Sequence, residues 1–252
     1  MSSSTDRALD ILELLSQRPR GPRELGEDLE VHRSTIVRLL HSMEERGYVR
    51  RLGDGLWGIG FQLVALGQRT LDSIDIREVA RPHLAALSEE MGHTIHVAAL
   101  VGADVVYVDK IEGLGSVKMQ SRVGAKAFAH TAGVAKAVLA FAPKAVQEEA
   151  IASCTFERFT HTTITDRDSL LEEFDRIRNR GWAVDDGEAE DYINCIAVPI
   201  FGMHGAVRGG MSVTAVRSLA PVSVLERQVS KVQEVAAAIS SDLGHQAAPI
   251  AR

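Results

Sequence analysis

The sequence predicts an α+β fold in two parts, a small helical part with a β-hairpin and a larger part of mixed helices and strands. Three observations lead to this prediction. Apolar residues recur at helical spacing in three successive segments before Gly47. Two short strand-like runs then flank the turn Gly53–Gly55. From Ile76 onward, strands and helices are interleaved without strict alternation, which favours an α+β arrangement.

The small part begins with three predicted helices. The first spans Thr5–Ser16, because its apolar residues fall on one face: Ala8, Ile11, Leu12 and Leu15. The second spans Pro22–Leu29, since a proline in the first turn loses no hydrogen bond. A tight turn then leads to a third helix, which we expect Ser34 to cap and which ends at Gly47. Two helices joined by so short a turn match the helix-turn-helix unit.

A predicted hairpin and a linker follow the third helix. The strands Tyr48–Leu52 and Leu56–Ile59 would form a wing beside the helix-turn-helix. A connecting helix is expected over Phe61–Leu71, and Ser73–Asp75 is the candidate hinge. We therefore expect a winged helix-turn-helix domain over residues 1–62 and a linker helix with a hinge over residues 63–76.

The larger domain is expected over residues 77–246, followed by a polar tail over residues 247–252. Its first helix runs from Ile76 to Gly92. Strands are expected over Thr94–Val101, Val105–Glu112, Ser116–Val123, Trp182–Asp186, Asn194–Phe201 and Ala206–Ala215. Further helices are expected over Gly133–Pro143, Pro143–Ser153, Asp166–Arg180 and Val222–Leu243.

Composition narrows the class of protein. The 252 residues are 45% hydrophobic and 25% charged, which is typical of a globular chain and excludes a disordered chain or a membrane bundle. No apolar run approaches the ~20 residues of a spanning helix, and no secretory signal is visible at the N-terminus. Cys154 and Cys195 form no disulfide framework, so we expect a cytoplasmic protein without membrane contact. The net charge of −6 excludes a generally basic nucleic-acid binder, yet residues 32–51 are rich in arginine.

The third predicted helix presents a face suited to DNA. With its apolar residues packed inward, Arg38 can bond two acceptors of guanine, and Thr35 and Val37 can contact a thymine methyl group. Arg50 and Arg51 precede the turn of the wing, where they can reach backbone phosphate. The candidate DNA-binding residues are Arg33, Ser34, Thr35, Val37, Arg38, His41, Arg50 and Arg51.

Several segments resemble the isocitrate-lyase-regulator (IclR) family of bacterial transcription factors. They are RALDILELL, RSTIVRLLHSMEERGYV, LWGIG, VVYVDKIE, SRVGAKAFAHTAGVAKAVLA, RGWAVDDGE and NCIAVPIF, in the family order and spacing. The resemblance implies a winged helix-turn-helix, a linker helix and a C-terminal α/β effector-binding domain similar to GAF domains. It also implies homodimers or dimers of dimers on palindromic operators, and a small-molecule effector, commonly a carboxylate or an aromatic acid.

The resemblance also implies an effector pocket. Family pockets combine an aspartate, a cysteine ten positions later and two hydroxyl residues on the next strand, with backbone amides from a helix start and apolar lining. The matching residues are Asp185, Cys195, Ser212, Thr214, Gly133, Val134, Met119 and Ile193. Amides and hydroxyls together can hold an oxyanion without a full positive charge. The chain departs from the family pattern at Ala135, before the helix lysine, and in the segment Asp191–Asn194.

The sequence therefore predicts a transcriptional regulator whose binding to a specific operator depends on a small metabolite. No catalytic residue, cofactor or metal is expected, since His93 and His96 lack a third ligand at metal spacing. Two alternatives stay open. A metabolite-binding enzyme domain fused to a DNA-binding head would need a catalytic set such as Asp185, Cys195 and a distant histidine. An interaction protein would use the winged domain for contacts with other proteins.

Overall fold

The structure, a computed structural model, describes residues 3–66, 75–113 and 121–246. The chain divides into two compact units between residues 74 and 75, within the expected linker and hinge. Residues 61–66 are helical, and the rest of the expected connecting helix lies outside the described residues. Asp75, expected in the hinge, caps the next helix, because its carboxylate accepts the Arg77 N–H at 2.9 Å.

The smaller unit has the predicted three helices and hairpin. Its elements are α1 (Ser4–Gln17), α2 (Pro22–Asp28), α3 (Arg33–Glu45), β1 (Val49–Arg51) and β2 (Trp57–Ile59). The two strands pair antiparallel across a 3₁₀ turn at Gly53–Gly55. One hydrophobic cluster joins all five elements through Ile11, Leu15, Leu25, Ile36, Leu40, Met43, Val49 and Trp57. The apolar stripes of the helices therefore meet in a single core, which orients the opposite face of α3 to solvent.

The start of α3 differs from the prediction that Ser34 caps this helix. His32 is the N-cap residue, and its Nδ1 accepts the backbone N–H of Ser34 at 3.3 Å. The Ser34 hydroxyl lies 2.7 Å from the same nitrogen. Since the imidazole already bonds a free amide of the first turn, Ser34 is left inside the helix with its hydroxyl beside the His32 ring.

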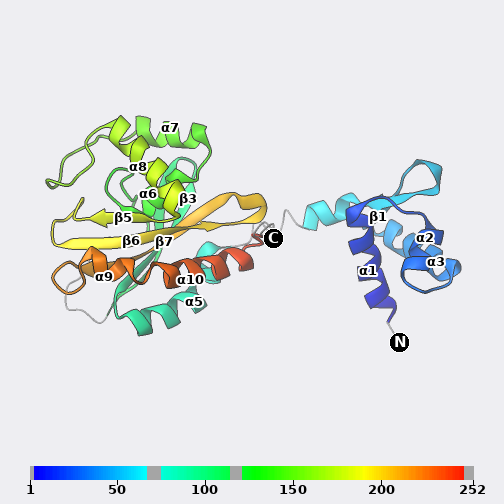
Figure 1. The fold of residues 1–252 in the computed structure, drawn as a ribbon. Coiled ribbons are helices and arrows are strands. Elements are labelled where there is room, and N and C mark those ends of the chain that lie inside the picture. The colour runs from blue at the N-terminus through cyan, green and yellow to red at the C-terminus, as the bar shows by residue number, and fades with distance from the viewer. Residues whose placement is uncertain (1–2, 67–74, 114–120, 247–252) are drawn as a thin grey trace. The chain divides into compact units, whose positions relative to one another are not determined.

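The larger unit is a sheet covered by helices on both faces (Figure 1). The strand order is β4-β3-β7-β6-β5, and all neighbouring strands are antiparallel. The strands are β3 (Thr94–Val101), β4 (Asp104–Ile111), β5 (Ala183–Asp186), β6 (Ile193–Phe201) and β7 (Val207–Val216). One face packs on α5 (Ile76–Met91), α9 (Val222–Glu226) and α10 (Val229–Asp242), and the other is covered by α6 (Gly133–Ala140), α7 (Lys144–Ala152) and α8 (Arg167–Arg180).

One predicted element of this unit is wrong, and most of another lies outside the described residues. Ser121–Val123 form no strand, and the remainder of the expected strand Ser116–Val123 lies outside the described residues. The expected single helix Val222–Leu243 is two helices, because Arg227 and Gln228 form a turn in which the Gln228 N–H bonds the Leu225 carbonyl at 2.9 Å. The apolar periodicity runs through this turn, so spacing alone does not reveal it.

Strand register places the polar residues of the larger unit. On β6, Cys195 lies opposite Asp185 of β5 and Thr214 of β7. Across the next strand pair, Ser212 of β7 lies opposite His96 of β3. Since residues two apart share one face of a strand, Ser212 and Thr214 face the same side of the sheet. The register therefore gathers side chains from four strands beneath α6.

Candidate functional site

The outward face of α3 carries the predicted base-reading side chains. Ile36, Leu40 and Met43 are buried, whereas Arg38 is exposed and Thr35 is partly exposed. The other predicted residues of this helix are exposed or partly exposed: Arg33, Ser34, Val37 and His41. Among the described residues, neither Arg33 nor Arg38 has an ion-pair partner, so both guanidinium groups are available to a ligand.

The two wing arginines are exposed but contact the protein itself. Arg51 pairs with Glu44 of α3, with its Nε 3.1 Å from Oε1, and lies over the Trp57 ring at 5.0 Å. Arg50 lies over the Phe61 ring at 5.1 Å. Arg51 therefore holds the hairpin against α3, and phosphate would compete with a carboxylate for its charge.

The predicted effector residues gather at one cavity of about 90 Å³ in the larger unit. Of the eight, all but Met119 line it, and Met119 lies outside the described residues. The full lining is His96, Tyr107, Ser121, Ala132, Gly133, Val134, Asp185, Glu190, Ile193, Cys195, Ser212 and Thr214. Sequence reasoning missed His96, Tyr107, Ser121, Ala132 and Glu190. The alternation of β3 would have placed His96 on this face, but only the pairing of β3 with β7 brings it to Ser212.

Backbone amides are available at one end of the cavity. α6 starts after Ala132, and no side chain caps it. Gly133 and Val134, the first two residues of α6, line the cavity. A Cβ on Gly133 would lie 2.7 Å from the Cys195 Sγ, so only glycine lets α6 begin this close to β6. The first-turn N–H groups and the helix dipole favour an anionic group here.

Carboxylates also line the cavity, and a Cβ on Gly133 would lie 3.5 Å from the Asp185 backbone nitrogen. Burial raises the pKa of Asp185 to about 6, although the charge of Lys136 and a 2.7 Å bond from the Glu188 N–H act in the opposite direction. Lys136 is fully buried in α6 and pairs with Glu188, with its Nζ 2.5 Å from the carboxylate oxygens. Burial raises the pKa of Glu188 as well, against the same lysine charge. The ammonium group of Lys136 is therefore already paired with the Glu188 carboxylate.

The cysteine and histidine of the cavity are held in their neutral forms. Burial raises the pKa of the Cys195 thiol, so the thiolate is disfavoured. Burial, with a smaller contribution from the charge of Lys110, lowers the pKa of His96 to about 4. The ring nitrogens of His96 lie 2.7 Å from the Ser121 Oγ and 3.3 Å from the Thr214 Oγ1. The cavity therefore offers hydrogen bonds and not an activated nucleophile.

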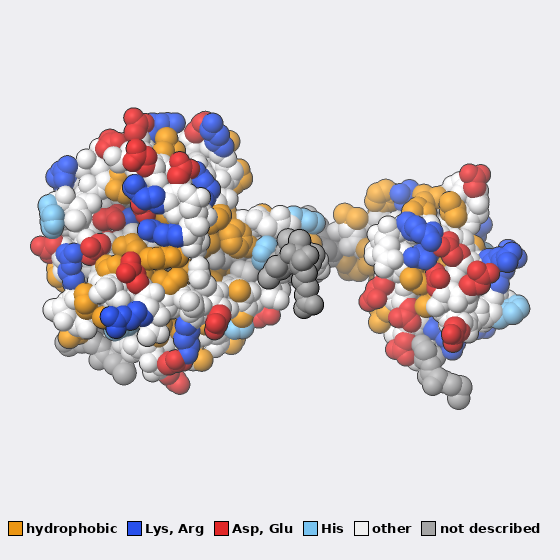
Figure 2. Space-filling view, in the orientation of Figure 1, with side chains coloured by type: hydrophobic (Ala, Val, Ile, Leu, Met, Phe, Trp, Pro, Cys, Tyr) orange, Lys and Arg blue, Asp and Glu red, His pale blue; other side chains and the backbone are white. Residues whose placement is uncertain are grey.

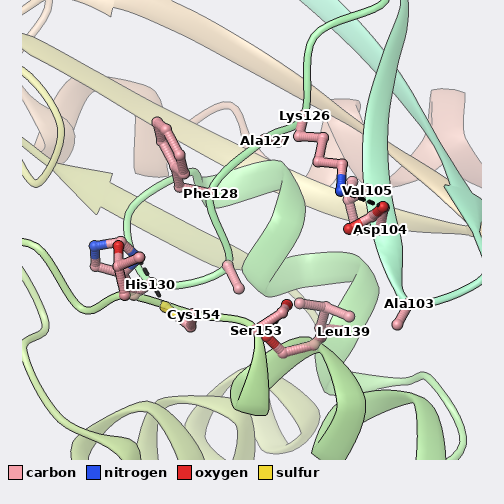
Figure 3. Close-up of a pocket in the computed structure, with 13 residues that line it drawn as sticks. Ala103, Asp104, Val105, Lys126, Ala127, Phe128, His130, Leu139, Ser153 and Cys154 are labelled. Atoms are coloured by element: carbon pink, nitrogen blue, oxygen red, sulfur yellow. Dashed lines mark hydrogen bonds and ion pairs between the residues drawn. The ribbon is translucent and has the colours of Figure 1, made fainter.

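A second cavity, of about 180 Å³, is built from other residues (Figure 3). None of the predicted effector residues lines it. The Cys154 Sγ lies 3.1 Å from Nδ1 of His130, whose Nε2 lies 3.0 Å from the Glu157 carbonyl oxygen. Burial raises the pKa of the Cys154 thiol, so the thiolate is disfavoured here as well. Lys126 pairs with Asp104 at the same cavity, as the dashed line in Figure 3 shows.

A shallower groove of about 390 Å³ lies where β6 meets α10. Hydrophobic side chains gather over this part of the larger unit in Figure 2. The groove is lined by Gly181, Val198, Pro199, Phe201, Gln233, Ala236, Ala237, Ser240, Ser241 and His245. In the described part of the chain, no helix is long and apolar enough to cross a lipid bilayer. No three histidine, cysteine or carboxylate residues of that same part form a group that could hold a metal ion.

Comparison with known proteins agrees with this architecture. Residues 4–53 match the family model of the IclR helix-turn-helix domain, and residues 68–241 match that of the bacterial transcriptional regulator IclR C-terminal domain. The HTH-type transcriptional regulator KdgR of Escherichia coli (strain K12) is 29% identical over 245 residues, covering 96% of this chain and 93% of KdgR.

Two solved structures share the fold over nearly the whole chain. The crystal structure of the Thermotoga maritima IclR is 31% identical, with a TM-score of 0.65, and the match covers 96% of this chain and 99% of that one. The repressor BlcR of Agobacterium tumefaciens has a TM-score of 0.79 at 24% identity, covering 96% and 97% of the two chains. Since a family model matches each of the two units and the larger match spans more than half of the chain, the chain belongs to the IclR family of bacterial transcriptional regulators.

Proposed function

We propose that this regulator reads a palindromic operator with α3 and the β1–β2 wing, and that a small metabolite in the cavity beneath α6 modulates this binding. The observation that carries the proposal is the outward face of α3. Arg38 is exposed there with no ion-pair partner among the described residues, while Ile36, Leu40 and Met43 are buried. A helix that buries its apolar face and exposes an arginine on the other can lie in the major groove and bring the guanidinium to base edges.

The wing arginines and the assembly complete the proposed interface. Arg50 and Arg51 stay exposed in the hairpin, where they can exchange their internal contacts for phosphate. A palindrome is read by two copies related by twofold symmetry, so we propose a homodimer or a dimer of dimers. The effector then acts by binding one arrangement of the DNA-binding units more tightly than another, and its influence is limited to that difference in affinity.

The size of the cavity bears on the class of effector. A cavity of ~150 Å³ is known to accept benzene, so a cavity of about 90 Å³ favours a small carboxylate over an aromatic acid. The free amides at the start of α6 and the hydroxyl of Ser212 are suited to its carboxylate group. We propose this end of the cavity as the anion subsite.

We further propose that the larger unit binds its metabolite without converting it and needs no cofactor. The protonated Cys195 and the neutral His96 support binding over nucleophilic catalysis. Curated relatives carry the names of transcriptional regulators, KdgR and XynR among them. Both cysteines are free thiols, which supports a location in the reducing bacterial cytoplasm, where the DNA lies.

Selection of bound sequences from random double-stranded DNA tests the proposal directly. The full chain is expected to enrich a palindrome whose half-sites are separated by a whole number of helical turns. The variant Arg23→Ala is the matched control, because Arg23 is an exposed arginine of α2 that pairs with Glu27 and is not among the predicted DNA-binding residues. Enrichment of no sequence would support an interaction module instead.

A further inference from the structure

The cavity beneath α6 contains polar atoms without partners. Oε2 of Glu190 is closed off from solvent and has no hydrogen-bond partner among the described residues, whereas the carboxylate as a whole also interacts with the Tyr192 hydroxyl and raises the pKa of Tyr192. The side chain of Ser212 is 3% exposed and has no hydrogen-bond partner among the described residues. Both residues line the cavity. A buried acceptor left unbonded is costly, and in native proteins it is normally met by water or by a ligand.

The charges around Glu190 decide what it can accept. Asp185 lines the same cavity, and the charge of Glu190 contributes to the raised pKa of Asp185. Lys136 is already paired with Glu188, and His96 is neutral. The Glu190 carboxylate therefore attracts a hydrogen-bond donor.

Resting on the proposed function, we infer that Glu190 selects a hydroxylated acid as the effector. The carboxylate of the ligand lies at the α6 amides, and a ligand hydroxyl donates its hydrogen bond to Oε2 of Glu190. A cavity of ~150 Å³ accepts the six carbons of benzene, so a cavity of about 90 Å³ favours an acid of about three carbons. The effector class is a three-carbon hydroxy acid, and Glu190 is its specificity-determining residue.

Titration calorimetry with three acids that differ only in hydroxyl groups tests this inference. The probes are glycerate, lactate and propionate, added to the full chain without DNA. We expect glycerate and lactate to bind more tightly than propionate. The hydroxyl that donates to the Glu190 carboxylate should increase the affinity by about tenfold. In Glu190→Gln the preference for lactate over propionate should fall by about tenfold, because the charge that strengthens the hydrogen bond from the ligand hydroxyl is gone.

Matched variants keep the result interpretable. Asp191→Asn removes an exposed neighbouring charge that does not line the cavity, so the preference should stay as in the wild type. If Glu190→Gln does not fold, Glu190→Asp withdraws the carboxylate by one methylene and must likewise lower the preference.

Three results would overturn the inference. They are equal affinity of the wild type for lactate and propionate, no binding of glycerate in the millimolar range, and an unchanged preference in a folded Glu190 variant. Selection from random DNA with the same preparation tests the regulator function separately. A failure there would count against the proposed function and leave the hydroxyl preference measurable, because the titration contains no DNA.

Discussion

In the proposed interface, Arg38 is the residue on which we expect base recognition by α3 chiefly to depend. It is exposed, and no described residue pairs with it. Arg38→Ala is expected to weaken binding to the selected operator by ~1–3 kcal/mol while binding to random DNA changes little, because a bidentate contact to guanine is specific. Gel-shift titrations on both DNAs measure this, with Arg23→Ala as the control. Equal losses on the two DNAs would show that Arg38 contacts phosphate only.

Asp185 makes the stability of the larger unit depend on pH. Burial raises the pKa of Asp185 from 3.8 to about 6, so the folded state holds this proton more tightly than the unfolded chain. The free energy of unfolding therefore falls as pH rises through this window, by up to about 3 kcal/mol at 1.36 kcal/mol per pKa unit. Asp185→Asn cannot ionise, yet its Oδ1 can still accept the Glu188 N–H. The stability of the variant relative to wild type should therefore increase from about pH 4 to about pH 7.

Chemical denaturation at several pH values measures this difference. His96 acts in the opposite sense over the same range, because burial lowers its pKa to about 4 and stability is lost as pH falls below the unfolded value. Glu188, whose pKa is also raised by burial, acts in the same sense as Asp185. The wild-type curve alone therefore mixes opposed contributions, and the difference between wild type and Asp185→Asn reports the one that Asp185 makes. A difference that does not change with pH would show that Asp185 ionises normally.

At the scale of elements, the close approach of α6 to β6 depends on Gly133. A methyl group there would lie 2.7 Å from the Cys195 Sγ, so α6 or the Cys195 side chain would have to shift. Gly133→Ala should lower the free energy of unfolding by ~1–3 kcal/mol and abolish the effector response. Adding Cys195→Ala removes the sulfur and should recover part of the lost stability. Thermal unfolding of the single and double variants tests this, and strictly additive losses would refute the contact.

The ends of the helices show where local rules succeed and fail. Asp75 and Asp166 cap α5 and α8 through their carboxylates, and Gly92 and Gly181 end those helices in the left-handed conformation. Such signals act within one turn of the chain, so a sequence displays them directly. At α3 the preference for serine as the N-cap residue predicted Ser34. The N-cap residue is His32, because its side chain accepts a hydrogen bond from a free amide of the first turn.

At the scale of the whole molecule, the effector must act across two units. Ser212 and Thr214 lie in the larger unit, whereas α3 lies in the smaller one. Ser212→Ala combined with Thr214→Val should therefore abolish the effector response and leave operator binding intact in its absence. The probe is the compound released from the purified protein and identified by mass spectrometry. It is titrated into a gel shift, with Ser153→Ala, which alters the second cavity, as the control. An unchanged response in the double variant would remove both hydroxyls from the effector site.

The sequence by itself determined the helix-turn-helix, the hairpin and most helices and strands of the larger unit. These elements follow from apolar periodicity, caps and turns, which involve residues near one another in the chain. It also indicated Asp185, Cys195, Ser212 and Thr214 through their positions in family motifs. The tertiary structure alone decided that His96 meets Ser212, that Tyr107 and Glu190 join the same cavity, and that the cavity holds only about 90 Å³. Those outcomes depend on which strands become neighbours and how closely α6 packs on them, and contacts between distant segments leave no periodic signal in the chain.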